Sequence, residues 1–230
     1  VQQSLHAAQA LVVLQGHAPQ ALPEGLRHKA QVIFQSTTAR KRLHKSDVQR
    51  HPLRALMVGH LREEKDPATL QQAAQLLKAR RPSILIRHIG AALDSSFEAE
   101  ALQAQATCPN YRWLGGQSHN QTRNRIQRAH VLVHTSRLEG GAHVIMEALR
   151  SGTPVLASRM SGNMGMLGDD YAGYFPVGDA RALAQALLRF QGDPDFRETL
   201  QRQCDIRAAL FDPHVEVKSL QHLVQGLLLN

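Results

Sequence analysis

The stretch that decides the fold is HVLVHTSRLEGGAHVIMEALRSGTPVLAS, which runs from residue 130 to residue 158. It opens with the apolar run HVLVHTS and continues through a loop with two glycines into the helix-like pattern AHVIMEALRSG. It ends in a second apolar run, TPVLAS, directly after Gly152, and glycine is a favoured helix stop. Two buried strands joined by a helix predict that the strands lie parallel in one sheet.

The same alternation recurs on both sides of this stretch. Further β-rich runs lie at 54–60, 83–90, 111–116 and 173–177, and helical patterns lie at 67–81, 96–106 and 120–129. Three more helical patterns, 179–190, 193–211 and 212–229, each open with an aspartate, which is a good N-cap residue. The sequence therefore predicts an α/β fold with a doubly wound, Rossmann-like parallel sheet.

The segment before residue 51 has a different character. LVVLQ and AQVIFQS flank a polar loop with Pro and Gly, and they look like the last strands of another α/β domain. The basic segment 37–51 looks like a linker. We predict a remnant of an N-terminal domain plus linker in 1–50, the main domain in 51–211 and a C-terminal helix in 212–230. Because the chain begins without Met inside a helical pattern, we expect a fragment of a longer protein.

Composition narrows the class of protein. With 43% hydrophobic residues, and without an apolar run of membrane-spanning length or a signal peptide, the sequence predicts a soluble globular protein without stable membrane insertion. Cys108 and Cys204 follow no metal or redox spacing, which favours a reducing, cytoplasmic location. The net charge of +8 allows a nucleic-acid partner, but the basic segment 39–54 holds no aromatic residue to stack on bases. We predict no nucleic-acid partner; a small anionic substrate suits the charge equally well.

The loop and helix of the opening stretch carry two carboxylates, Glu139 and Glu147, eight positions apart. Ligands of doubly wound sheets bind beyond the carboxyl ends of the strands, and a helix N-terminus there suits phosphate. Gly140 and Gly141 let backbone approach a ligand closely, and the spacings of three and four residues predict that Gly140, His143 and Glu147 share one helix face. Glu147 could then hold a ribose diol, and Glu139 a sugar hydroxyl. The alternative without a ligand is a turn that contains glycine, followed by a helix whose glutamates lie on a solvent-exposed face.

Cations follow another predicted strand. In VGHLREEKDPATL, residues 58–70, Arg62 and Lys65 come after Gly59 and before a helix that Pro67 opens. Two cations at a strand's carboxyl end can neutralise a diphosphate. Ordinary surface charge, balanced by the neighbouring acidic residues, is the alternative.

A third segment, YRWLGGQSH, places the single tryptophan, Trp113, before a Gly-Gly turn, where it could frame a base or pack in the core. The sequence contains no G-x-G-x-x-G fingerprint, no P-loop and no metal-spaced cluster of His, Cys or Asp. These absences disfavour a dinucleotide-dependent dehydrogenase and a P-loop nucleotidase. We predict no metal site and no cofactor.

Taken in order, the three segments resemble the C-terminal donor domain of glycosyltransferase family four, which has the two-domain GT-B fold. That family shows a strand followed by G-R-L and a lysine, an F-L-G strand, and an E-G-x-G-x-x-x-x-E-A loop and helix followed by G-x-P-V-x-A-S. Here they appear as Gly59–His60–Leu61 with Lys65, as Trp113–Leu114–Gly115, and as Glu139 to Ala148 followed by GTPVLAS. The resemblance covers residue 54 to the end.

The resemblance implies a metal-independent transferase that uses a UDP-sugar as co-substrate. It implies that Glu147 holds the donor ribose, that Glu139 contacts the sugar, and that Lys65 contacts the diphosphate. Because His60 replaces the family's arginine, Arg62 is the alternative second cation. We expect three residues to act in catalysis, Arg62, Lys65 and Glu139. We expect the donor to be bound by Gly59, His60, Trp113, Leu114, Gly115, Gln117, Gly140, Gly141, Ala142, His143, Val144 and Glu147.

The segments EGGAHVIMEALRSGTPVLAS, SGNMGMLGDDYAGYFPVGD and VGHLREEKDP resemble a narrower group, the selenosugar synthases of selenoneine biosynthesis. This resemblance implies transfer from UDP-N-acetylglucosamine or UDP-glucose to selenophosphate. An ordinary hexosyltransferase with a hydroxyl acceptor and a non-catalytic nucleotide or nucleic-acid binding module are the alternatives. The sequence leaves the oligomeric state open.

Overall fold

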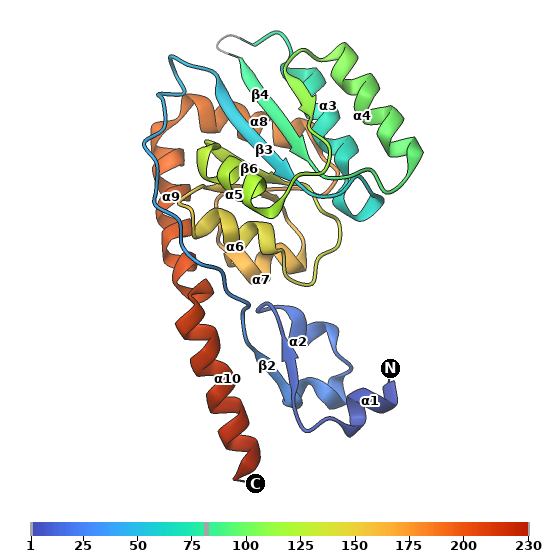
Figure 1. Ribbon diagram of the computed structural model, residues 1–230, viewed down its shortest axis with the longest axis vertical. Helices are drawn as coiled ribbons and strands as arrows, with labels where there is room; N and C mark the ends of the chain where they lie inside the picture. Colours follow the sequence, from blue (N-terminus) through green and yellow to red (C-terminus); the bar gives the residue numbers. More distant parts are fainter. Residues whose placement is uncertain (1, 81–82, 230) are drawn as a thin grey trace.

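Most of the chain forms one α/β domain around a parallel sheet (Figure 1), in a computed structural model that describes residues 2–80 and 83–229. The strand order is β5-β4-β3-β6-β7-β8. It runs outward in both directions from the central pair β3 and β6, so the predicted doubly wound sheet is confirmed. The strands are β3 (Leu53–Val58), β4 (Ile84–Ile89), β5 (Tyr111–Trp113), β6 (Val131–His134), β7 (Val155–Ser158) and β8 (Tyr174–Phe175).

Helices cover both faces of the sheet. In Figure 1, α5 and α6 lie in front of the central strands, and α3 and α8 lie behind them. The helices of this domain are α3 (Pro67–Leu77), α4 (Ser95–Thr107), α5 (His119–Arg128), α6 (His143–Leu149), α7 (Ser161–Leu167), α8 (Ala180–Gly192) and α9 (Pro194–Ala208), with 3-10 turns η2 (Glu63–Lys65) and η3 (Ala209–Phe211).

Local sequence signals set the ends of these helices. Asp179, Asp193 and Asp212 accept hydrogen bonds from backbone N–H groups in the first turns of α8, α9 and α10 (Pro213–Leu228), so the three predicted N-caps are confirmed. The opening stretch ends its helix as expected, because Gly152 adopts φ 66° just past α6. The core between sheet and helices is apolar, and Leu53, Ile84, Leu132 and Leu156 are fully buried.

The N-terminal part forms a small unit of its own. Its two strands, β1 (Leu11–Val13) and β2 (Ala30–Val32), pair in parallel, with Leu11 opposite Ala30. Two short helices and a 3-10 turn accompany them, α1 (Gln2–Ala7), α2 (Ala18–Ala21) and η1 (Glu24–Lys29). An extended segment then runs to β3 (Figure 1). The predicted strands are therefore present, whereas their assignment to a remnant of another domain stays a prediction.

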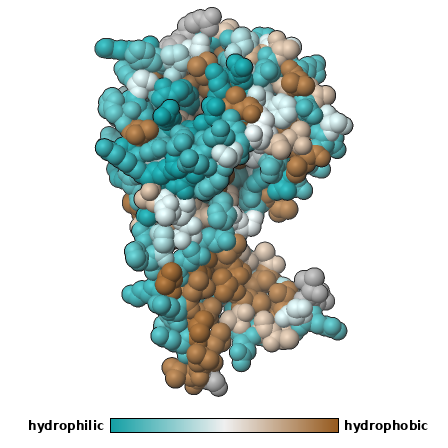
Figure 2. All heavy atoms as spheres, viewed as in Figure 1, coloured by the Kyte–Doolittle hydropathy of each residue, from teal (hydrophilic) through white to brown (hydrophobic). Residues whose placement is uncertain are grey.

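Helix α10 extends away from the main domain alongside this N-terminal unit (Figure 1). Figure 2 shows apolar side chains gathered along α10 and the adjacent strands, and the exposed ones include Val217, Val224 and Leu228 of α10 and Val32 of β2. No helix among the described residues is long and apolar enough to cross a bilayer.

Two buried histidines belong to the centre of the sheet. His88 on β4 is fully buried, and its ring nitrogens lie 3.0 Å from the Gly59 carbonyl oxygen and 3.2 Å from the Tyr111 hydroxyl. His134 at the end of β6 is 3% exposed. Burial lowers the pKa of each imidazole to about 4. For His88 the Gly59 carbonyl opposes burial; for His134 the Glu139 carboxylate opposes it and Lys65 adds to it.

This burial predicts an acid-sensitive fold. In the unfolded chain both histidines take up protons near pH 6.5, while in the folded chain they stay neutral until about pH 4. Stability is therefore expected to fall as the pH drops through this window, by about 2 kcal/mol for each histidine between pH 7.5 and 5. Urea unfolding at both pH values measures it. An unfolding free energy that stays constant over this interval contradicts the assignment.

Candidate functional site

The site lies where the strand order reverses, beyond the carboxyl ends of β3 and β6, where ligands of doubly wound sheets bind. A cavity of about 400 Å³ opens there. Residues from the loops after four strands meet around it, although they are far apart in sequence. Its lining consists of Val58, Gly59, His60, Arg62, Lys65, Ile89, Gly90, Gly116, Gln117, Thr122, Glu139, Gly141, Ala142, His143 and Val144.

The loop after β3 holds Lys65 in place. Residues Glu63–Lys65 form the 3-10 turn η2, and Asp66 follows it in the left-handed region with φ 47°. Aspartate tolerates this conformation better than most residues. The buried Asp66 carboxylate also caps α3, because it accepts hydrogen bonds from the Thr69 amide and hydroxyl. The sharp turn thus carries the chain from strand to helix and leaves the Lys65 side chain at the cavity.

An ion pair between Lys65 and Glu139 joins the two predicted catalytic segments. Both side chains are largely buried, and the Ser136 hydroxyl donates a further hydrogen bond of 2.9 Å to the same carboxylate oxygen, Glu139 Oε1. Burial by itself raises the pKa of Glu139, but the hydrogen bond and charge of Lys65 outweigh it and hold this pKa below its ordinary value. A charged carboxylate and an ammonium group therefore face the cavity together.

His134, the last residue of β6, lies next to the Glu139 carboxylate of this ion pair. Its Nε2 atom lies 3.5 Å from Glu139 Oε1 and has no hydrogen-bond partner among the described residues. The low pKa of His134 keeps the ring neutral above about pH 4, so Lys65 is the cation that balances Glu139. Sequence reasoning missed this residue, because a histidine that ends a buried strand carries no signal of what it faces.

The loops after β3 and β6 are tied to each other. The Thr135 hydroxyl donates a 2.7 Å hydrogen bond to the Lys65 carbonyl, and the Arg137 amide donates one of 2.8 Å to the Glu64 carbonyl. The Arg137 guanidinium also lies 3.2 Å from the buried Asp66 carboxylate. These contacts fix the spacing between the ammonium and carboxylate groups and limit the freedom of either loop.

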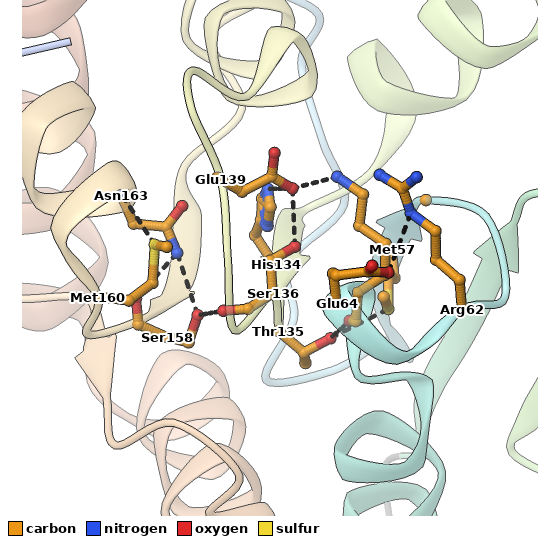
Figure 3. A network of polar contacts seen from close by, with 12 residues as sticks. Met57, Arg62, Glu64, His134, Thr135, Ser136, Glu139, Ser158, Met160 and Asn163 are labelled. Carbon is orange, nitrogen blue, oxygen red and sulfur yellow. Dashed lines mark hydrogen bonds and ion pairs between the residues drawn. The ribbon is translucent and has the colours of Figure 1, made fainter. Parts of the chain in front are cut away.

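On the other side, α7 closes against the Glu139 loop. The Ser158 hydroxyl donates to the Ser136 carbonyl, and the buried Asn163 amide donates to the Ser158 carbonyl at 2.9 Å (Figure 3). Gly162 lies so close that a Cβ atom there would stand 2.2 Å from the Glu139 carbonyl oxygen. The helix packs directly on the loop backbone only because this residue has no side chain.

Gly162→Ala is therefore expected to displace the Glu139 loop and to lower the free energy of unfolding by about 1–3 kcal/mol. Gly192→Ala at the end of α8 is the matched control, because a Cβ atom there meets nothing within 4 Å. The control is expected to leave stability unchanged or to raise it by less than about 1 kcal/mol. Chemical denaturation compares the two variants. Equal stability of both would show that the loop does not depend on this contact.

Glu147 lies on α6 and is only 7% exposed. Its two neighbours, His119 and Arg123, were not predicted from the sequence. Glu147 Oε1 lies 2.7 Å from the exposed His119 ring and 3.8 Å from the buried Arg123 guanidinium. Arg123 in turn donates hydrogen bonds to the Thr37 hydroxyl and, at 2.8 Å, to the Thr38 carbonyl. The buried carboxylate is thus coupled to the segment that connects the N-terminal unit with the main domain.

The remaining predicted residues divide into two groups. Lining the cavity are Gly59, His60, Arg62, Lys65, Gln117, Glu139, Gly141, Ala142, His143 and Val144, whereas Trp113, Leu114, Gly115, Gly140 and Glu147 are absent from its lining. Trp113 packs partly against the core and donates a 2.8 Å hydrogen bond from Nε1 to the Gly90 carbonyl. Helix α6 begins only at His143, so Gly140 belongs to the loop and does not share the helix face of Glu147, contrary to the spacing argument.

The two cations suggested near the diphosphate differ in character. His60 accepts a 3.2 Å hydrogen bond from the Ala91 amide at Nδ1, so this ring nitrogen is engaged by the backbone. Arg62 is half exposed, 3.6 Å from Glu64, and free to turn toward a ligand at the cavity that it lines. Arg62 therefore stays the predicted second cation. No group of three His, Cys, Asp or Glu residues in the described ranges could hold a metal ion.

Fold and site together define a Rossmann-like, doubly wound α/β domain with a cation and carboxylate pair where the strand order reverses. The chain belongs to the family of group 1 glycosyl transferases, whose family model matches residues 39–205. Two curated relatives support this. A D-inositol 3-phosphate glycosyltransferase of Corynebacterium urealyticum is 29% identical over 178 residues, or 74% of this chain and 42% of that protein. An amylovoran biosynthesis glycosyltransferase of Erwinia amylovora is 26% identical over 194 residues, or 79% of this chain and 46% of that protein.

The chain spans less than half the length of each of the two curated relatives. Solved structures show the same fold. A sucrose-phosphate synthase from Thermosynechococcus elongatus matches with TM-score 0.80 at 23% identity, over 99% of this chain and 60% of that one. The Anabaena protein HepE in complex with UDP-glucose matches with TM-score 0.77 at 19% identity, over 97% of this chain and 68% of that one. The expected membership of the GT-B glycosyltransferases is thereby confirmed at the level of fold and family, whereas the assignment to their C-terminal half stays a prediction.

Proposed function

We propose that this chain is the donor-binding part of a glycosyltransferase that uses a UDP-sugar. The observation that carries the proposal is the Lys65–Glu139 ion pair at the switch-point cavity, with Arg62 at the same cavity. An ammonium and a guanidinium group suit a diphosphate, and a charged carboxylate suits sugar hydroxyls. The UDP and UDP-glucose complexes of the structurally similar HepE support the choice of donor.

In the proposed reaction, an acceptor atom forms a bond to C1 of the sugar while the bond from C1 to the diphosphate oxygen breaks. The electron pair leaves with UDP, so negative charge grows on the diphosphate in the transition state. Lys65 and Arg62 stabilise that charge, and because the Lys65 ammonium is already held at the cavity, it needs little reorganisation during the reaction. Glu139 orients the sugar through its hydroxyl groups, and Glu147 accepts hydrogen bonds from the ribose of the donor.

The finer proposal is a selenosugar synthase, which rests on the sequence resemblance of the loop and helix from Glu139 to Ala148 and the segments around it. Selenium of selenophosphate then attacks C1 of UDP-N-acetylglucosamine or UDP-glucose, and later hydrolysis of the Se–P bond releases phosphate. Because selenophosphate is already anionic, this acceptor needs no strong general base. The two named relatives, which are glycosyltransferases of other specificities, favour a second candidate, transfer to a hydroxyl acceptor.

The full-length protein tests both candidates. Incubation with a UDP-sugar and selenophosphate is expected to give a selenium-containing sugar and UDP, detected by mass spectrometry, and reactions without selenophosphate serve as controls. UDP release with hydroxyl acceptors but no selenium-containing sugar would remove the finer proposal and retain the transferase. Absence of UDP binding and of UDP-sugar consumption would instead favour a non-catalytic binding module. The cytoplasmic location, the absence of a cofactor and the absence of a nucleic-acid partner remain proposals.

A further inference from the structure

A second cavity lies on the face of the sheet beside α5, away from the Lys65–Glu139 site. Its volume is about 550 Å³, which is in the range of small-molecule sites. Among residues 2–80 and 83–229, four arginines line it, Arg54 from β3, Arg87 from β4, and Arg125 and Arg128 from α5, and no carboxylate does so. We call this cavity the arginine pocket. The face shown in Figures 1 and 2, with α5 in front of the sheet, is largely hydrophilic in this part of the molecule.

Strand register explains why cations gather here. Leu56 on β3 pairs with Arg87 on β4, and Arg87 pairs with Arg112 on β5, so the three side chains stand in one row on the same face. Neighbouring strands are about 4.8 Å apart, and like charges at that separation repel. Arg54 lies two residues before Leu56 and therefore projects from the same face.

Helix α5 completes the pocket from the other side. Gln121, Asn124, Arg125 and Arg128 occur at spacings of three and four residues, so they form one stripe of the helix, and all four line the pocket. The pocket's floor is apolar, with Ala55, Leu56 and Leu85. Four arginines, two amides and an apolar floor from different elements thus converge on one hollow.

The arginines of this pocket have no acidic partners. Within residues 2–80 and 83–229, no Asp or Glu lies within ion-pair distance of Arg54, Arg87, Arg112, Arg125 or Arg128. Partial burial, followed by repulsion from Arg112 and Arg125, lowers the pKa of Arg87 below its ordinary value. The folded chain therefore holds uncompensated positive charge in a half-enclosed space, and a bound anion would relieve this repulsion.

We propose that the arginine pocket binds a small organic phosphate that carries at least two negative charges. Guanidinium groups match phosphate in geometry and charge, and the apolar floor and amides suit the organic part. Single-stranded nucleic acid is the less favoured ligand, because no aromatic side chain lines the pocket and bases would have nothing to stack on. This site does not depend on the proposed function.

Inorganic pyrophosphate is the probe, and a Lys65→Ala background removes one of the two cations, Lys65 and Arg62, that line the other cavity. Calorimetry is expected to detect pyrophosphate binding to Lys65→Ala that weakens at least about tenfold when Arg54→Gln and Arg87→Gln are added. The pair Arg181→Gln and Arg202→Gln is the matched control, because both residues are exposed and lie outside the pocket. Arg125 is left intact, because its Nε donates a hydrogen bond to Gln117 of the other cavity.

Thermal unfolding provides a second readout. Pyrophosphate is expected to raise the unfolding temperature of the Lys65→Ala protein and of the control, but not of the Arg54→Gln, Arg87→Gln protein. Equal binding by all three proteins, or no binding by any of them, would overturn the proposal. A single-stranded oligonucleotide that binds more tightly than pyrophosphate and is lost with the same arginines would assign the pocket to nucleic acid instead.

Discussion

Replacing Lys65 with alanine is expected to lower the turnover number of the full-length enzyme by about 10²–10³-fold, since a fixed charge that stabilises a transition state is typically worth this much. The Lys65 ammonium is largely buried and held at the cavity by the 3-10 turn η2. In the proposed reaction, its replacement removes positive charge from the place where the departing diphosphate gains negative charge. Initial rates at saturating donor measure the loss.

Two variants separate this effect from a structural one. Lys78→Ala is the matched control, because Lys78 is exposed at the end of α3, and its turnover is expected to stay unchanged. Lys65→Ala also leaves the buried Glu139 carboxylate without its cation, and adding Glu139→Gln removes that unpaired charge. Full recovery of turnover in the double variant would show that Lys65 serves Glu139 and not the donor.

Replacing Glu147 with alanine is expected to weaken UDP binding about 100-fold. A carboxylate that accepts two hydrogen bonds from a ribose diol contributes about 1.5 kcal/mol or more for each, which corresponds to this factor. Arg123 and His119 hold the Glu147 carboxylate in position on α6 before any ligand arrives. Calorimetry with UDP compares the variant with the unmodified chain and with Glu100→Ala, an exposed site on α4.

The ribose assignment can be separated from a loss of folding with a modified ligand. If Glu147 holds the diol, 2′-deoxy-UDP binds the unmodified chain more weakly than UDP does, and the two ligands bind Glu147→Ala almost equally. Glu147→Gln keeps the side-chain volume and one acceptor oxygen, so an intermediate affinity is expected. The assignment is contradicted if 2′-deoxy-UDP binds more weakly than UDP by the same factor in the unmodified chain, in Glu147→Ala and in Glu147→Gln.

Much of the fold was predictable from local patterns. The apolar runs, Gly152 and the N-cap aspartates are short-range signals, and the strands and helices of the opening stretch occur where these signals place them. Helix α7 was missed because its sequence, SGNMGML, contains two glycines, which disfavour a helix on propensity alone. Those glycines are there for packing: Gly162 meets the Glu139 loop and Gly165 meets Gln15. Tertiary contact thus overrode local propensity.

The site was predictable only in part. Sequence order placed Lys65 and Glu139 at the ends of two strands, and the sheet topology then brought them together, which residue spacing could not show. The two partners of Glu147, His119 and Arg123, were not predicted from the sequence, for different reasons. The capping box from Ser118 to Gln121 is a sequence signal that could have placed His119 at a helix start. Arg123, which binds Thr37 across 86 residues, gives no such signal.

The most direct test of the account is a crystal structure of this chain soaked with UDP. The account predicts the diphosphate in the cavity beyond β3 and β6, within hydrogen-bond distance of Lys65 Nζ. It predicts the ribose hydroxyls on the Glu147 carboxylate, which lies outside the lining of that cavity. UDP bound in the arginine pocket or elsewhere, with the Lys65–Glu139 cavity still empty at a concentration that saturates binding in solution, would contradict it.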